Sequence, residues 1–207
     1  MSYFPFFVEL SGKRGLIVGG GKVALGKAEK GLPFGPRLTV VAPEVLPELA
    51  ARPGIFVLRR PFQPEDLEGM DFVIAAADPA TNQEAARMCR ERNTPVNVVD
   101  DRAACTFLFP ALVKRGRLTV GISTGGASPT AAVHVKERVE ALLPEKLEEI
   151  LDFLERLRPA LKEVVPHPQR RAALHAALFQ RCLEVGGPLN DRQLGEVLEE
   201  MREERDG

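Results

Sequence analysis

Three consecutive glycines at positions 19 to 21 follow the apolar run Arg14–Val18 and precede a segment with helical spacing. Together with Ala24 they fit the pattern G-x-G-x-x-A. This pattern needs a tight turn at Gly19 and a bare backbone at Gly21, so that a pyrophosphate can approach the helix N-terminus, and a small residue at Ala24 for close packing. The position between a strand and a helix favours a dinucleotide-binding turn over a simple connecting turn.

Short apolar runs alternate with segments of helical periodicity through the first hundred residues. The runs span 14–18, 38–41, 55–58, 72–76 and 96–99, and the clearest helices span 23–32 and 80–92. Continuous apolar strands bounded by helices are typical of a parallel sheet covered on both faces. We therefore predict an α/β, doubly wound, Rossmann-like domain.

The chain changes character beyond this region. Two strands, 106–113 and 118–123, are expected around a tight basic turn at 114–117, and such a hairpin would extend the sheet or pair with a second subunit. Ser128 is the expected N-cap of a helix that starts at Pro129 and ends near Leu143. Beyond Pro144, leucines at helical spacing predict helices near 147–164, 169–185 and 191–204.

Composition narrows the classes of partner. Among 207 residues, 28 Lys and Arg balance 29 Asp and Glu, which argues against nucleic acid or an anionic membrane as a partner. No apolar run is long enough to span a bilayer, and no basic stretch precedes the N-terminal aromatics as in a signal peptide. The widely spaced Cys89, Cys105 and Cys182 favour a reducing compartment, so we expect a cytoplasmic protein.

Glu44 is the nearest carboxylate after the second expected strand, about 20 residues past Ala24 as the dinucleotide pattern asks. It fits equally well as the acid that binds the adenosine ribose and as an ordinary loop acid. No Arg or Lys directly follows this strand, which favours NAD over NADP. After the fourth strand, small residues that include Ala76 would let a cofactor lie across the sheet edge, and Asp78 is expected to cap the next helix.

Asp100 and Asp101 follow the last buried strand of this region. Open α/β sheets bind ligands at the carboxyl ends of their strands, where an acid can take a proton. We assign chemistry to Asp100 and a capping role to Asp101. The three histidines have no partner at metal-ligand spacing, so no metal site is predicted.

Several segments together resemble the precorrin-2 dehydrogenases, which form the N-terminal module of siroheme synthases. The matching segments are 3–8, 15–24 with Lys27, 38–43, 97–101, 105–111 and 122–129. They occur in family order from Tyr3 to about Pro144, and their combination is specific although the glycine pattern alone is not.

The resemblance implies a homodimer that uses NAD to oxidise precorrin-2 to sirohydrochlorin, with iron insertion by a ferrochelatase activity in some members. It implies a Rossmann domain over 1–113, a dimerisation region of hairpin plus helix over 114–144, and a helical domain over 145–207. The implied dinucleotide contacts, together with those of the glycine pattern, are Gly19, Gly21, Lys22, Val23, Pro43, Glu44 and Ala76.

At the tetrapyrrole, the resemblance implies that Asp100 is the acid–base residue, with Asn97 beside it. The implied lining of the macrocycle site is Thr124, Gly125, Gly126 and Ser128. Thr124 stands where many relatives carry serine, and it retains the hydroxyl group. An alternative function is an NAD-binding, redox-sensing regulatory subunit without catalysis, which explains the glycines but leaves 97–101 and 124–129 without a role.

Overall fold

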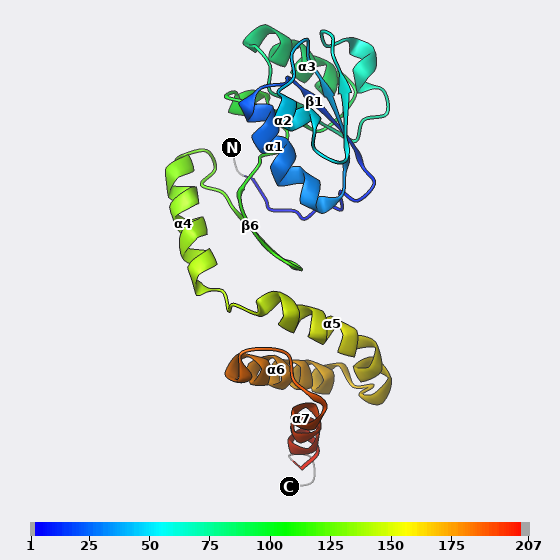
Figure 1. Ribbon diagram of the computed structural model, residues 1–207, viewed down its shortest axis with the longest axis vertical. Helices are drawn as coiled ribbons and strands as arrows, with labels where there is room; N and C mark the ends of the chain where they lie inside the picture. The colour runs from blue at the N-terminus through cyan, green and yellow to red at the C-terminus, as the bar shows by residue number, and fades with distance from the viewer. Residues whose placement is uncertain (1–2, 204–207) are drawn as a thin grey trace. The chain divides into compact units, whose positions relative to one another are not determined.

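The computed structural model describes residues 3–203, and the chain divides into two compact units, Met1–Pro110 and Ala111–Gly207 (Figure 1). The first unit contains a sheet of five parallel strands in the order β3-β2-β1-β4-β5. The strands are β1 (Arg14–Val18), β2 (Arg37–Val41), β3 (Ile55–Leu58), β4 (Phe72–Ala75) and β5 (Val96–Val98). The predicted α/β, doubly wound fold is confirmed.

Helices cover both faces of this sheet. The helices are α1 (Lys22–Gly31), α2 (Pro47–Ala50) and α3 (Pro79–Glu91), with 3-10 turns η1 (Leu32–Phe34), η2 (Pro64–Leu67) and η3 (Arg102–Ala104). Ala24 and Ala28 of α1 pack with Leu49 of α2 against one face of the sheet. Ala85 and Cys89 of α3 pack against the other face. Because side chains alternate along a strand, β1, β2 and β4 supply residues to both cores, whereas β5 supplies Val96 and Val98 only to the core under α3.

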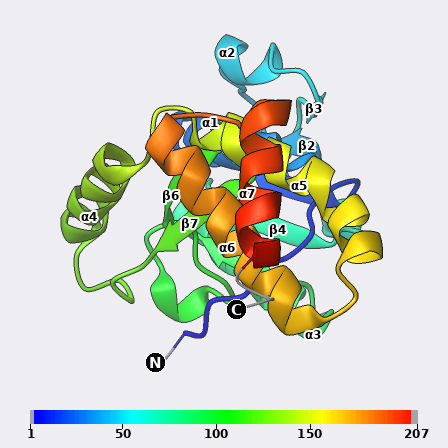
Figure 2. The same ribbon diagram turned by 90° about the horizontal axis from the view of Figure 1, so that it is seen from below.

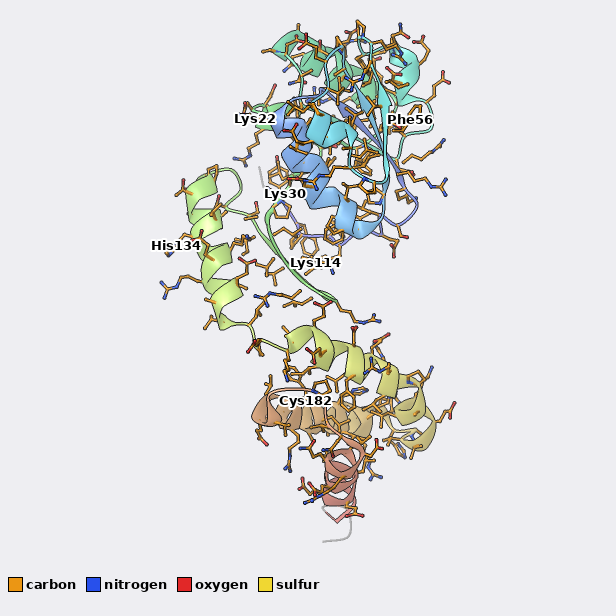
Figure 3. The ribbon with its side chains drawn as sticks, viewed as in Figure 1. Lys22, Lys30, Phe56, Lys114, His134 and Cys182 are labelled. Atoms are coloured by element: carbon orange, nitrogen blue, oxygen red, sulfur yellow. The ribbon has the colours of Figure 1, made fainter. Side chains whose placement is uncertain are left out.

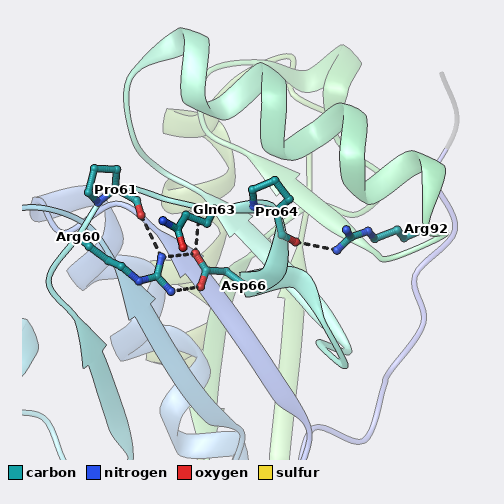
Figure 4. A network of polar contacts seen from close by, with 6 residues as sticks. All are labelled: Arg60, Pro61, Gln63, Pro64, Asp66 and Arg92. Atoms are coloured by element: carbon teal, nitrogen blue, oxygen red, sulfur yellow. Dashed lines mark hydrogen bonds and ion pairs between the residues drawn. The ribbon is translucent and has the colours of Figure 1, made fainter.

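The connection from β3 to β4 returns from the edge of the sheet to its centre and is held by a polar network (Figure 4). Arg60 donates two hydrogen bonds to the Asp66 carboxylate, and the Gln63 backbone N–H donates a third at 2.8 Å. Arg92, which directly follows α3, donates a hydrogen bond to the carbonyl oxygen of Pro64 at 2.8 Å. Burial raises the pKa of Asp66, but the hydrogen bonds from Arg60 and Gln63 outweigh it, so this pKa lies below its ordinary value.

The second unit begins with an antiparallel hairpin, β6 (Ala111–Arg115) and β7 (Leu118–Ile122), followed by α4 (Pro129–Leu142). The α4 helix lies beside the hairpin in both views (Figures 1 and 2). The Ser128 hydroxyl accepts a hydrogen bond from the Ala131 N–H at 3.1 Å, which confirms the predicted N-cap.

The expected strand at 106–113 is wrong over its first half. Thr106 instead donates its backbone N–H to the carbonyl oxygen of Val96 at 2.8 Å, and the segment then runs on without strand structure to Pro110. The aromatic side chains of this segment pack inside the first unit, where the Phe107 ring contacts the rings of Phe72 and Phe109. The predicted turn is also shorter, since Lys114 and Arg115 belong to β6.

The unit ends with three helices, α5 (Leu147–Val164), α6 (Pro168–Val185) and α7 (Asp191–Glu203), close to the predicted positions. Their shared core contains Ile150 of α5, Leu178 and Cys182 of α6 and Val197 of α7. Cys182 is labelled in Figure 3. Along residues 3–203, none of the helices combines the length and the apolar character needed to cross a bilayer.

Candidate functional site

Backbone contacts from two other strands fix the turn that follows β1. Gly19 has a φ of 118°, and a Cβ at this position would overlap the carbonyl oxygen of Ala76, just beyond β4. A Cβ on Gly20 would overlap the carbonyl oxygen of Glu44 and lie 2.7 Å from the Cα of Val45, beyond β2. Only glycine fits these positions without moving the backbone. The turn therefore joins the carboxyl ends of β1, β2 and β4.

The open side of the turn fits a dinucleotide pyrophosphate. The strand order reverses at β1, with β2 and β3 on one side and β4 and β5 on the other, and doubly wound sheets bind ligands in the crevice at such a switch point. Gly21 is the N-cap of α1, and a Cβ there would meet no atom within 4 Å. No side chain caps this helix and its first turn has no acidic residue, so its backbone N–H groups face outward with the positive end of the helix dipole.

The residues predicted to contact the dinucleotide surround this turn. Lys22 and Val23 are exposed in the first turn of α1, and Figure 3 shows Lys22 and Lys30 toward opposite ends of the helix. Pro43 and Glu44 are exposed just beyond β2. The Leu46 N–H, on the same loop, donates to the carbonyl oxygen of Gly20 at 2.9 Å. The structure thus brings together all seven predicted positions.

Asp100 lies beyond β5, which neighbours β4, and therefore at the same carboxyl edge of the sheet. Its side chain is exposed and its φ is 61°, a left-handed conformation that only Asn93 shares among the described non-glycine residues. Asp101 behaves differently, because its carboxylate accepts hydrogen bonds from the Ala104 N–H and from Gln83. It caps η3, as the sequence suggests, and leaves Asp100 as the exposed acid.

Asn97 of β5 is 4% exposed, and its carboxamide is bonded within the protein. Its Oδ1 accepts a hydrogen bond from Lys27 Nζ at 3.1 Å, and its Nδ2 donates to the carbonyl oxygen of Phe107 at 3.0 Å. Nδ2 also lies 3.5 Å from the Cys105 Sγ. The amide therefore joins α1, β5 and the segment that leads to β6.

The Thr124–Ser128 turn belongs to the second unit and is closed by its own hydrogen bonds. Thr124 Oγ1 donates to the Ser128 carbonyl oxygen at 3.0 Å and accepts from the Ser128 N–H at 3.1 Å. Gly125 and Gly126 have φ values of 62° and 85°, so the chain reverses where glycine is favoured. These hydrogen bonds hold the turn in one conformation between β7 and α4.

The described part of the chain contains no group of three His, Cys, Asp or Glu side chains placed to hold a metal ion. The contact between Lys27 and Asn97 was not predicted from the sequence, where Lys27 was noted only as part of the resemblance. A usable signal was present, since Lys27 follows Ala24 by three positions and therefore flanks the buried stripe of its helix.

Comparisons with known proteins agree with this geometry. A family model described as "Putative NAD(P)-binding" matches residues 6–111, half of the chain. A second, described as "Sirohaem biosynthesis protein central", matches residues 115–142. A solved structure named "SirC, precorrin-2 dehydrogenase" superposes with a TM-score of 0.75 and 26% identity, and the match covers 97% of this chain and 100% of that one.

Two siroheme synthases are similar in sequence. The one from Pseudomonas entomophila is 40% identical over 94% of this chain and 42% of its own length. The one from Pseudomonas paraeruginosa is 38% identical over 87% of this chain and 40% of its own length. This chain thus spans about two fifths of the curated relatives that it matches. Because the first model covers half of the chain, the chain belongs to this "Putative NAD(P)-binding" family.

Proposed function

We propose that this chain is an NAD-dependent precorrin-2 dehydrogenase, which oxidises precorrin-2 to sirohydrochlorin. The observation that carries the proposal is that an open glycine turn and an exposed carboxylate, Asp100, lie at the same edge of a Rossmann-type sheet. A solved protein named precorrin-2 dehydrogenase shares the fold over nearly the whole chain, which supports the same reaction here.

In this reaction the substrate loses two hydrogens, one as a hydride and one as a proton. Bound NAD⁺ would accept the hydride. The N–H groups at the start of α1 would bind the pyrophosphate, which the open space at Gly21 would admit. Gly19 and Ala76 would line the strand ends that the dinucleotide crosses. Pro43 and Glu44 would line the adenosine side of the turn.

The proton would pass to the carboxylate of Asp100. Its exposure lets it reach a large substrate, and the capping role of Asp101 keeps the neighbouring acid out of the reaction. We assign Thr124, Gly125, Gly126 and Ser128 to the lining of the macrocycle site. The two hydrogen bonds between the Thr124 hydroxyl and the Ser128 backbone would hold the shape of that turn while the substrate binds.

The test is an anaerobic assay of NADH formation from precorrin-2 and NAD⁺ with purified protein. Asp100→Asn removes the charge and keeps the left-handed backbone, which Asn tolerates. We expect its kcat to fall roughly 100- to 10,000-fold, the usual contribution of a general base, with NAD⁺ affinity unchanged. Asp101→Asn is the matched control, because Asn also caps well, and it should keep kcat within about threefold. Normal turnover by Asp100→Asn would exclude the assigned role.

The same assay separates the alternative of an NAD-binding regulatory subunit. That function predicts NAD⁺ binding without affinity for a tetrapyrrole. Iron insertion, which the family resemblance also implies, is tested by adding Fe²⁺ and sirohydrochlorin anaerobically and following the macrocycle spectrum. An insertion rate equal to the protein-free rate would leave the dehydrogenase activity alone.

We further propose that residues 114–144 form the dimerisation region of a homodimer. The α4 helix exposes Val133, Val135 and Leu142, with Leu142 83% exposed, and apolar side chains of this size are typical of a surface that a partner covers. Light scattering after size exclusion, compared with a Leu142→Glu and Val135→Glu double variant, tests the dimer.

The three free cysteines support a reducing, cytoplasmic location.

A further inference from the structure

Lys27 sends its side chain from α1 to β5, across the carboxyl half of the sheet. It lies on the helix face of Ala24 and Ala28, both fully buried, and its own side chain is half-buried. Its Nζ donates to the Asn97 Oδ1 at 3.1 Å and lies 4.4 Å from the centre of the Phe109 ring. Both partners are uncharged, and a cation over an aromatic ring is favourable.

The contacts continue from Asn97 to the residues on both sides of Asp100. Asn97 Nδ2 donates to the carbonyl oxygen of Phe107, and the Cys105 Sγ lies 3.1 Å from the Val98 nitrogen and 3.3 Å from the Asp101 carbonyl oxygen. The strand before Asp100 and the segment after it are therefore tied to the same amide that binds Lys27. The left-handed backbone at Asp100 is supported from both ends.

Charge adds a second link between Lys27 and Asp100. Burial and the nearby charge of Lys30 lower the pKa of Lys27, whereas the charges of Cys105 and Asp100 oppose this change. Lys27 therefore supplies a positive charge within electrostatic range of the exposed acid. None of the polar contacts of Lys27 described above involves the glycine turn.

We propose that Lys27 is a positioning residue of the dehydrogenase site, which acts through Asn97 on the backbone that carries Asp100. This inference rests on the proposed function. It also assigns Asn97 to the support of Asp100, since both ends of its carboxamide are bonded within the protein.

The experiment compares Lys27→Met, which removes charge and donor, with Lys27→Arg, which keeps both. Lys30→Met is the matched control, because Lys30 is an exposed lysine one turn along the same helix. We expect Lys27→Met to lower kcat roughly 10- to 100-fold, the scale of a 1 Å misplacement, with KM for precorrin-2 and the Kd of NAD⁺ within about threefold. Lys27→Arg should recover most of the loss, and Lys30→Met should stay within twofold of the native kcat.

A readout independent of turnover is the ¹⁵N–¹H spectrum of the side-chain amides. The Asn97 cross-peaks should move in Lys27→Met, because the amide loses its donor, and stay in place in Lys30→Met. In an Asp100→Asn background, Lys27→Met should change kcat less than twofold, because its effect passes through Asp100. If Lys27→Met does not fold, Lys27→Leu, which also removes the charge and the donor, replaces it with the same expected loss.

The outcomes separate the two proposals. An inactive native protein that binds NAD⁺ refutes the dehydrogenase function itself. An active native protein with normal kcat in Lys27→Met or Lys27→Leu refutes only the role of Lys27. A loss confined to NAD⁺ affinity also refutes it, since that result would place Lys27 at the dinucleotide.

Discussion

Gly20 and Gly21 are adjacent, yet replacing them by alanine should have different effects. Gly21→Ala should weaken NAD⁺ binding, whereas Gly20→Ala should lower stability. Gly21 has φ −88° and ψ −170°, which alanine adopts freely, and a Cβ there meets no atom within 4 Å. The free energy of unfolding should therefore fall by only roughly 0.5 to 1 kcal/mol, the preference of an N-cap for glycine over alanine.

The binding of NAD⁺ should respond much more strongly to Gly21→Ala. The new methyl group would stand where a phosphate oxygen approaches the first N–H groups of α1. Losing one hydrogen bond to a charged group costs about 1.5 to 3 kcal/mol. At about 1.4 kcal/mol for each factor of ten, the Kd should rise roughly 10- to 150-fold.

Gly20→Ala should instead affect mainly the free energy of unfolding. Its Cβ would overlap the Glu44 carbonyl oxygen and crowd the Val45 Cα, and backbone atoms cannot turn away as a side chain can. Overpacking of this kind lowers stability by roughly 1 to 3 kcal/mol. Urea unfolding and isothermal titration with NAD⁺ measure both quantities on both variants. Native NAD⁺ affinity in Gly21→Ala, or equal stabilities of the two variants, would refute the reasoning.

Three further predictions concern stability and thiol reactivity. Asp66→Asn should lower the free energy of unfolding by roughly 1 to 3 kcal/mol at neutral pH. Because the folded-state pKa of Asp66 lies below its unfolded value near 3.9, this stabilisation is lost as pH falls, so native and variant urea curves should converge below about pH 4. Ser128→Ala should cost about 1 kcal/mol in thermal unfolding through the lost cap of α4, and Ser128→Gly should cost less. Burial raises the pKa of Cys89 to about 11, so iodoacetamide at about pH 8 should leave Cys89 unmodified by mass spectrometry until urea unfolds the protein.

The sheet is predictable from sequence because each strand is a short, mainly apolar run that is followed by a glycine, a proline or a polar residue. The region 106–110 shows the limit of this rule. Phe107 and Phe109 pack against other residues of the first unit, and the spacing of apolar residues alone cannot distinguish a packed connection from a strand.

The candidate site is only partly readable from sequence. The pattern G-x-G-x-x-A leaves its second position free, whereas the structure requires glycine at Gly20 because the chain beyond β2 passes over it. Lys27 meets Asn97 across seventy positions, a contact that depends on how α1 crosses the sheet. In both cases the constraint arises from tertiary packing, which local patterns do not record.

The overlap that forbids a side chain at Gly19 also sets an order of events during synthesis. Ala76 follows β4, which is synthesised after β1, α1 and β2, so we expect the nascent β1–α1–β2 segment to leave the ribosome before its cofactor site is complete. Because a ligand stabilises only the form that binds it, NAD⁺ cannot hold this early segment against misfolding. Until β4 has been added between β1 and the ribosome, the growing chain depends on its own apolar contacts or on chaperones.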